Sequence, residues 1–150
     1  MNGLKWLILG AGALFVMKKY NEIDFLARTA WGEARNQGEQ GMQAVCNVVV
    51  NRVNAKRWYS GSIVQVITMD QQFSAWNIGD PNRAAMLAVG MDDPQFKQAF
   101  DLAFRAVMGT LPDITNGATH YLVAGTPAMW RDDTKIVERL GDHVFYAGIA

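Results

Sequence analysis

Cysteine, histidine and proline are scarce in this chain of 150 residues, which has one cysteine, two histidines and four prolines. A single cysteine, Cys46, cannot form an intrachain disulfide, and one cysteine with two histidines is a poor basis for a structural zinc site. Charged residues make up 19% of the chain and hydrophobic residues 50%, which excludes a disordered or collagen-like protein. A chain of this length has room for one core, so we expect one globular domain.

Dense positive charge is also lacking, because the 14 Lys and Arg are balanced by 14 Asp and Glu. The densest basic sites are the pairs Lys18-Lys19 and Lys56-Arg57. Proteins that bind nucleic acids neutralise several phosphates with a surface rich in Lys and Arg. The sequence therefore predicts no nucleic-acid partner.

One apolar run, WLILGAGALFVM over residues 6–17, is flanked by Lys5 and by Lys18-Lys19. As a helix it would span about 18 Å, which is less than the roughly 30 Å of a bilayer's hydrocarbon core. Three interpretations stay open for residues 1–20: a signal-anchor or membrane-associated segment, a cleavable signal peptide, and a helix packed on the domain core. We treat residues 21–150 as the domain that carries the function.

Three segments place apolar residues at helical spacing. The first is predicted to begin at a capping box formed by Asn21 and Asp24, and the second follows Gly38. The third opens at Asp93-Pro94 and ends at Gly109, a left-handed helix cap. Shorter helices are expected over residues 62–68 and from Asp80-Pro81, after a loop over residues 71–80.

The pattern changes after Gly117. Residues 118–123, 135–140 and 144–147 are short runs compatible with β-strands, and Gly, Pro and Asp separate them. The sequence therefore predicts an α+β fold, a mostly helical domain with a small antiparallel sheet near the C-terminus.

Glu33 is the first candidate for catalysis. It lies at the edge of an apolar helix stripe, where partial burial near Trp31 would raise the pKa of its carboxyl group and make it a usable general acid. Gly32 costs about 1 kcal/mol relative to alanine inside a helix, so we expect a ligand or another backbone to approach it closely. The alternative is a solvated glutamate paired with Arg35.

Three further features allow more than one interpretation. The segment Gln72-Phe73-Ser74-Ala75-Trp76 combines amide, hydroxyl and aromatic groups suited to a sugar, but it could also be an aromatic plug over the core. His120 and His143, with Glu33 or Asp142, could form a metal site, although no His-Glu-x-x-His motif occurs. Cys46 lies on an apolar helix stripe, which favours an inert core residue over a nucleophile.

Six motifs follow one another along the chain: LARTAWGEAR at 26–35, GEQGMQAV at 38–45, NRV at 51–53, QFSAW at 72–76, GATHY at 117–121 and GDHVFY at 141–146. Together they resemble the SleB-type cell wall hydrolase family, which includes spore cortex-lytic enzymes and phage endolysins. The resemblance covers residues 23–146. It implies a lysozyme-like domain that acts on the glycan strands of peptidoglycan.

The resemblance also implies roles for particular residues. Glu33 matches the catalytic glutamate of the family. The segments that line the family's substrate groove match Gln72, Phe73, Ser74, Trp76, Thr119, His120, Tyr121, His143 and Tyr146. Trp31, near Glu33, is predicted as a further substrate contact, and neither a metal nor another cofactor is expected.

A single glutamate is enough for a lytic transglycosylase, which forms 1,6-anhydro-MurNAc when it cleaves the linkage between MurNAc and GlcNAc. That is the predicted reaction. A hydrolytic muramidase would ordinarily need a second carboxylate, such as Asp142 or Asp70. The sequence also leaves open a metal-dependent amidase and a non-catalytic glycan-binding protein.

Such an enzyme is expected to work in the periplasm or at the cell surface. Residues 4–19 resemble the signal-anchor-release segments of some phage endolysins, so we expect a transient association of this segment with the inner membrane. The pair Lys18-Lys19 argues against that topology.

Overall fold

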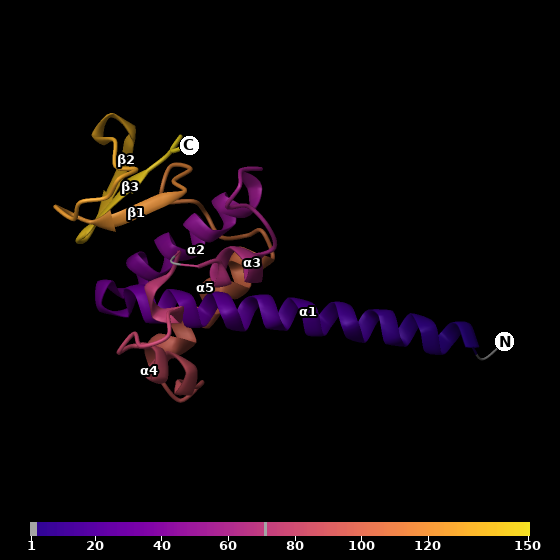
Figure 1. The fold of residues 1–150 in the computed structure, drawn as a ribbon. Coiled ribbons are helices and arrows are strands. Elements are labelled where there is room, and N and C mark those ends of the chain that lie inside the picture. Colours follow the sequence, from indigo (N-terminus) through magenta and orange to yellow (C-terminus); the bar gives the residue numbers. More distant parts are fainter. Residues whose placement is uncertain (1–2, 71) are drawn as a thin grey trace.

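The computed structural model describes residues 3–70 and 72–150, with side chains from residue 12 onward. Its fold class is the predicted one, mostly helical with a small antiparallel sheet near the C-terminus (Figure 1). In chain order the elements are α1 (Gly3–Ala34), η1 (Arg35–Gln37), α2 (Gly38–Asn54), α3 (Ile63–Thr68), η2 (Ser74–Trp76), α4 (Arg83–Ala88), α5 (Pro94–Val107), β1 (His120–Val123), η3 (Asp133–Lys135), β2 (Ile136–Leu140) and β3 (His143–Tyr146).

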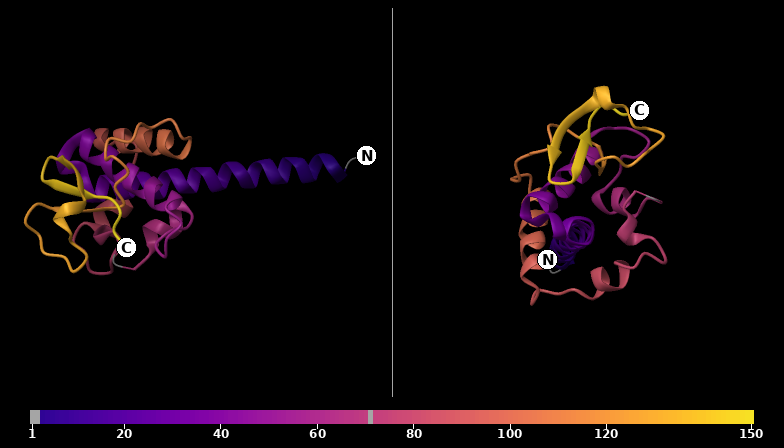
Figure 2. Two further views of the ribbon diagram at one scale, coloured as in Figure 1. Left: turned by 90° about the horizontal axis from the view of Figure 1, so that it is seen from above. Right: turned by 90° about the vertical axis from the view of Figure 1, so that its left-hand side faces the viewer.

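Helix α1 runs without a break through Asn21, so the predicted helix start at that residue is wrong. No glycine or proline stands between Met17 and Asn21, and the helical hydrogen bonds therefore continue. The C-terminal half of α1 crosses the domain between α2 and α4, whereas the N-terminal half extends away from it (Figures 1 and 2).

The described side chains of the N-terminal segment project from the domain. Leu14, Phe15, Val16 and Met17 are between 64% and 69% exposed, so packing of this part on the core, one of the three interpretations, is wrong. No helix among the described residues is long and apolar enough to cross a membrane. Residues 1–2, the side chains of residues 3–11 and Gln71, the first residue of the predicted loop, lie outside the described part.

The main core forms where α1, α2 and α5 pack together. Helix α5 begins as predicted, because the Asp93 carboxylate accepts a hydrogen bond from the Phe96 N–H at 2.8 Å and Pro94 occupies the first turn. It stops before Gly109, whose φ of +74° is the predicted left-handed conformation. Helices α2 and α3 also form where the sequence predicted them.

The three predicted strands are confirmed to within two residues and form an antiparallel sheet in the order β1-β3-β2. The register pairs His120 with Tyr146 and Tyr121 with Phe145. Because side chains alternate along a strand, Tyr121 and Phe145 share one face and His120 and Tyr146 share the other. The Phe145 face packs on α2.

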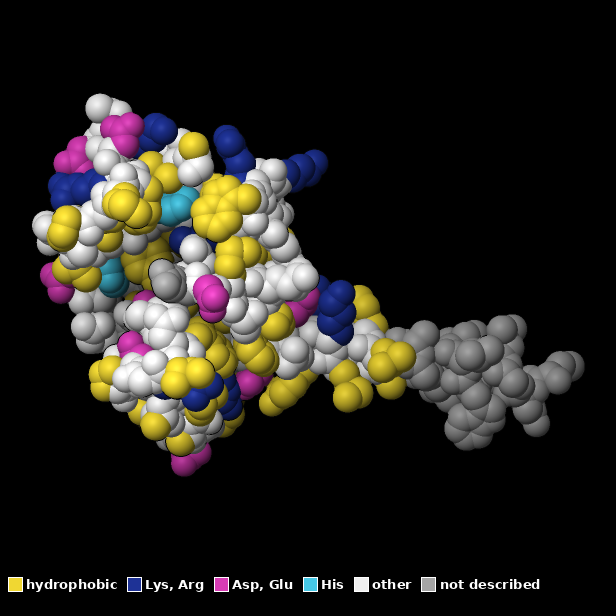
Figure 3. All heavy atoms as spheres, in the orientation of Figure 1, with side chains coloured by type: hydrophobic (Ala, Val, Ile, Leu, Met, Phe, Trp, Pro, Cys, Tyr) yellow, Lys and Arg dark blue, Asp and Glu magenta, His cyan; other side chains and the backbone are white. Residues whose placement is uncertain are grey.

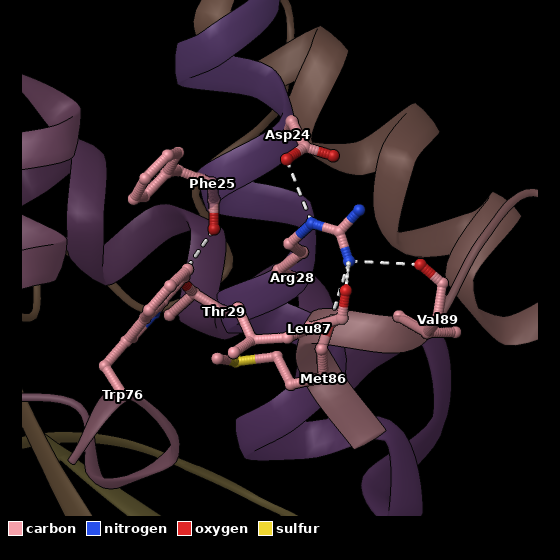
Figure 4. A network of polar contacts seen from close by, with 8 residues as sticks. All are labelled: Asp24, Phe25, Arg28, Thr29, Trp76, Met86, Leu87 and Val89. Atoms are coloured by element: carbon pink, nitrogen blue, oxygen red, sulfur yellow. Dashed lines mark hydrogen bonds and ion pairs between the residues drawn. The ribbon is translucent and has the colours of Figure 1, made fainter. Parts of the chain in front are cut away.

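Helix α4 is tied to α1 by Arg28 (Figure 4). Arg28 Nη1 lies 2.8, 3.2 and 3.0 Å from the carbonyl oxygens of Met86, Leu87 and Val89, and Nε donates to Asp24 at 2.9 Å. These carbonyls stand at the C-terminal end of α4, where a helix leaves acceptors without intrahelical partners. Arg28 therefore fixes α4 against the C-terminal third of α1.

The predicted helix start at Asp80-Pro81 is wrong by two residues. The Asp80 carboxylate accepts from the Asn82 N–H at 2.8 Å and so stabilises a turn, and α4 begins only at Arg83. An Asp side chain that bonds to the backbone two residues ahead competes with helix initiation at that point.

Replacing Arg28 by methionine keeps the aliphatic volume but removes the donors at the end of α4. We expect the free energy of unfolding to fall by about 1.5–3 kcal/mol, the range for hydrogen bonds to a charged group, in urea denaturation. Arg105→Met is the control, because its surface pair with Asp101 at 3.7 Å is expected to contribute less than about 1 kcal/mol. Equal losses for both variants would contradict the role of Arg28.

Candidate active site

The molecular surface is hollowed between the sheet and the side of the domain that carries α4 (Figure 3). Glu33 lines one cavity, and Tyr121, whose hydroxyl donates to Glu33, lines another. One, of about 250 Å³, is lined by Gly32, Glu33, Arg35, Asn36 and Asn82. The other, of about 200 Å³, is lined by Arg52, Trp58, Gln72, His120, Tyr121 and Trp130.

Three donors converge on the carboxylate of Glu33, which stands in the last turn of α1. Oε1 accepts from the Ala75 N–H at 2.9 Å and from the Ser74 hydroxyl at 3.3 Å. Oε2 accepts from the Tyr121 hydroxyl at 3.2 Å. The first two donors belong to η2 and the third to β1, so two distant parts of the chain hold this one side chain.

Burial raises the pKa of Glu33 above its ordinary value of 4.5, because desolvation disfavours the carboxylate more than the three hydrogen bonds favour it. The negative charge of Asp80 acts in the same direction as burial. Arg35 does not pair with Glu33, since its guanidinium lies 4.2 Å from the centre of the Trp31 ring and donates to Asn82 Oδ1 at 2.8 Å. The interpretation of Glu33 as a solvated, paired glutamate is therefore wrong.

Gly32 allows a close approach, but the atoms nearest to it belong to side chains and not to the ligand or backbone that the sequence predicted. A Cβ atom at this position would lie 3.0 Å from Ala75 Cβ and 3.0 Å from Met86 Sδ. The absence of a side chain thus lets η2 and α4 press against α1, which brings the Ala75 N–H to Glu33.

The predicted sugar-binding loop is divided between the site and the core. Ser74 reaches Glu33 and Gln72 lines the second cavity. Phe73 is 1% exposed and packs in the core, so its predicted contact with substrate is wrong. Trp76 stacks on Phe25 with ring centres 5.0 Å apart, and its Nε1 donates to Thr29 at 2.9 Å (Figure 4).

The two histidines lie on opposite faces of the sheet. His143 packs edge-on against Tyr121 at 5.2 Å. His120 lies between Tyr59 and Trp130, at 5.3 and 4.9 Å, and burial lowers its pKa to about 4. Since they point apart, the two rings cannot share one ion with Glu33. In the described residues, no group of three His, Cys, Asp or Glu side chains could hold a metal ion.

Tyr146 is 1% exposed, packs on Trp130 at 5.4 Å and donates to Asp133 at 3.3 Å. Strand alternation places it on the His120 face of the sheet and it lines neither cavity, so its predicted contact with substrate stays a prediction. Thr119 is buried and its carbonyl oxygen accepts from Arg52 Nε at 2.6 Å. Thr119 therefore holds Arg52 in the wall of the second cavity without lining that cavity itself.

Two buried residues line neither cavity. The ring of Trp31 lies beneath the Arg35 guanidinium and is not among the residues that line either cavity, so its predicted contact with substrate stays a prediction. Cys46 is completely buried and desolvation raises its pKa to about 12, which confirms an inert core residue.

Sequence reasoning missed several groups around the site. The Ala75 donor is a backbone N–H and leaves no side-chain signal. Arg52 stands in the NRV motif, but nothing local shows that it borders a cavity. Trp58 and Trp130 come from segments far apart in sequence, and only the folded chain brings them together.

Gly32→Ala should push η2 or α4 away from α1 by a few tenths of an ångström, because the added Cβ would lie only 3.0 Å from Ala75 Cβ and from Met86 Sδ. Overpacking of this kind costs about 1–3 kcal/mol of unfolding free energy, measured by urea denaturation, and here it should also weaken cell-wall cleavage. Gly12→Ala is the matched control, since nothing lies within 4 Å of that position and alanine is the better helix former. A Gly32→Ala variant as stable and active as Gly12→Ala would contradict this role.

Comparison with known proteins agrees with this architecture. The sequence profile of the cell wall hydrolase family matches residues 36–146, a range that begins three residues after Glu33. The chain therefore belongs to the cell wall hydrolase family and is a peptidoglycan-degrading enzyme. No curated protein sequence matches the chain.

Two solved structures share the fold. The catalytic domain of the SleB protein from Bacillus cereus has a TM-score of 0.63 and 23% identity, over 85% of this chain and 90% of that one. The catalytic domain of SleB from Bacillus anthracis, described as a germination-specific lytic transglycosylase, has a TM-score of 0.63 and 23% identity, over 84% and 93%. These likenesses confirm a SleB-type fold.

Proposed function

We propose that this enzyme cleaves the linkage between MurNAc and GlcNAc as a lytic transglycosylase, with Glu33 as its catalytic acid and base. The observation that carries this proposal is a single half-buried carboxyl group whose pKa is raised and whose two oxygens are held by three donors. The description of the Bacillus anthracis relative supports it.

The reaction follows from the two protonation states of Glu33. The protonated carboxyl gives its proton to the glycosidic oxygen as the C1–O4 bond breaks. The resulting carboxylate is stabilised by Ala75, Ser74 and Tyr121, and it then takes the proton of the muramic acid 6-hydroxyl as O6 bonds to C1. The product is the 1,6-anhydro sugar, and Glu33 returns to its starting state.

A hydrolytic muramidase would require a second carboxylate near Glu33. Neither predicted candidate is among the groups that act on Glu33: Asp142 accepts a hydrogen bond from Gln37 at 3.0 Å, and Asp70 is exposed. Asp80 is the described carboxylate whose charge acts on Glu33, so it is the residue to test for hydrolysis.

The products decide between the two reactions. Glu33→Gln should lower the rate of peptidoglycan cleavage by about 10² to 10⁴, the usual contribution of a general acid, while Asp80→Asn keeps most of the activity. Mass spectrometry of the fragments released by the native chain should show 1,6-anhydro-muramyl ends.

Reducing ends that disappear in both variants would instead establish hydrolysis with Asp80 as the second carboxylate. Equal cleavage by the native chain and Glu33→Gln would remove Glu33 from the mechanism. No cleavage by either would favour a glycan-binding protein.

We also propose that residues 4–19 hold the enzyme at a membrane surface on the periplasmic side. Support comes from the exposed apolar side chains of residues 14–17. In a flotation assay with vesicles of anionic phospholipid, the native chain should float, and Leu14→Ser with Phe15→Ser should not. Ile78→Ser, an exposed apolar position in the loop between η2 and α4, is the control; equal flotation of all three would contradict the proposal.

A further inference from the structure

Arg52 is a buried cation with few partners. The residue is 4% exposed, and among the described residues only its Nε donates a hydrogen bond, to the Thr119 carbonyl oxygen at 2.6 Å. Nη1 is buried and has no partner in the same part of the chain, and none of the ion pairs found there includes Arg52. A buried, unpaired charge is costly, which makes a missing acceptor the natural explanation.

The cavity that Arg52 borders contains no negative group to pair with it. Its other lining residues supply aromatic rings, an amide and a hydroxyl: Trp58, Gln72, His120, Tyr121 and Trp130. The Phe73 ring centre lies 5.2 Å from the guanidinium carbon on the core side. The charge of Arg52 helps to lower the pKa of His120, so that imidazole is neutral at physiological pH and does not compete for an anion.

This cavity adjoins the catalytic group. Tyr121 lines it and donates to Glu33 Oε2 at 3.2 Å, so one side chain borders both the cavity and the carboxyl group. Tyr121 thus links the Glu33 carboxyl group to the cavity that Arg52 borders, and the subsite proposed below requires a sugar at Glu33 to extend a substituent past Tyr121.

We propose that Arg52 forms a subsite for a carboxylate carried by the lactyl ether of muramic acid, an inference that rests on the proposed function. A guanidinium presents parallel N–H donors that match the two oxygens of a carboxylate. Trp58 and Trp130 offer apolar faces beside it. The carboxylate can belong to the lactyl group itself on a strand without peptide, or to the stem peptide attached there.

Binding of small probes to the native chain tests the subsite without turnover. N-acetylmuramic acid should bind about 10-fold or more tightly than its methyl ester in calorimetric or NMR titrations, because a charge-assisted hydrogen bond is lost in the ester. N-acetylmuramoyl-L-alanyl-D-isoglutamine and its amide form the second pair, which reports a stem carboxylate. Equal binding within both pairs would overturn the proposal, whereas a preference in one pair identifies the source.

Arg52→Gln should reduce the acid-to-ester preference to about 1, and Arg52→Lys should keep part of it because the charge remains. Arg57→Gln, at an exposed position of the neighbouring loop, is the control and should retain the full preference. Since Arg52 also supports the Thr119 carbonyl, the variants are compared only if their unfolding midpoints show a folded chain. If Arg52→Gln does not fold, the comparison of acid and ester on the native chain decides alone.

The outcomes for the two proposals are distinct. If the chain prefers the acid but does not cleave peptidoglycan, the subsite is supported and the proposed reaction is contradicted. If it forms anhydro products but shows no preference for the acid, the reaction is supported and the subsite is contradicted.

Discussion

The close approach of η2 to the last turn of α1 is the contact on which the site depends. Gly32 has no side chain, so Ala75 can come near enough for its N–H to reach Glu33. The same approach takes the carboxyl group out of water and raises its pKa. Arg28 holds α4 against α1, and Met86 of α4 presses on Gly32 from another direction. The packing of η2 against α1 at Gly32 thus sets both the position and the protonation of Glu33.

Strand β1 connects this contact to the rest of the hollow. Thr119, just before the strand, accepts from Arg52, while Tyr121, two residues on, donates to Glu33. His120 between them points to the opposite face and packs on Trp130. One short segment therefore sets the distance between the group proposed to cleave the sugar and the cation proposed to bind its acidic substituent.

Apolar periodicity predicted the helices and strands well, because it reports which faces are buried. It could not show that α1 continues before Asn21, since a capping residue permits a helix to begin but does not stop one already formed. Nor could it show that Ser74 and Tyr121 contact Glu33 while their neighbours in the predicted site, Phe73 and Tyr146, are buried elsewhere. Loop orientation and strand register decide this, and both depend on contacts between distant segments. The sequence could not point to Arg52, because only the folded chain shows that its Nη1 is buried without a hydrogen-bond acceptor among the described residues.

The most direct test of this account is the titration of the Glu33 carboxyl carbon by NMR in the native chain, with the signal assigned by its absence in Glu33→Gln. The account predicts a titration midpoint above 4.5, so that Glu33 keeps its proton where an exposed glutamate has lost it. A midpoint at or below 4.5 would show that the three hydrogen bonds outweigh burial, and Glu33 would then be a poor acid for glycosidic cleavage.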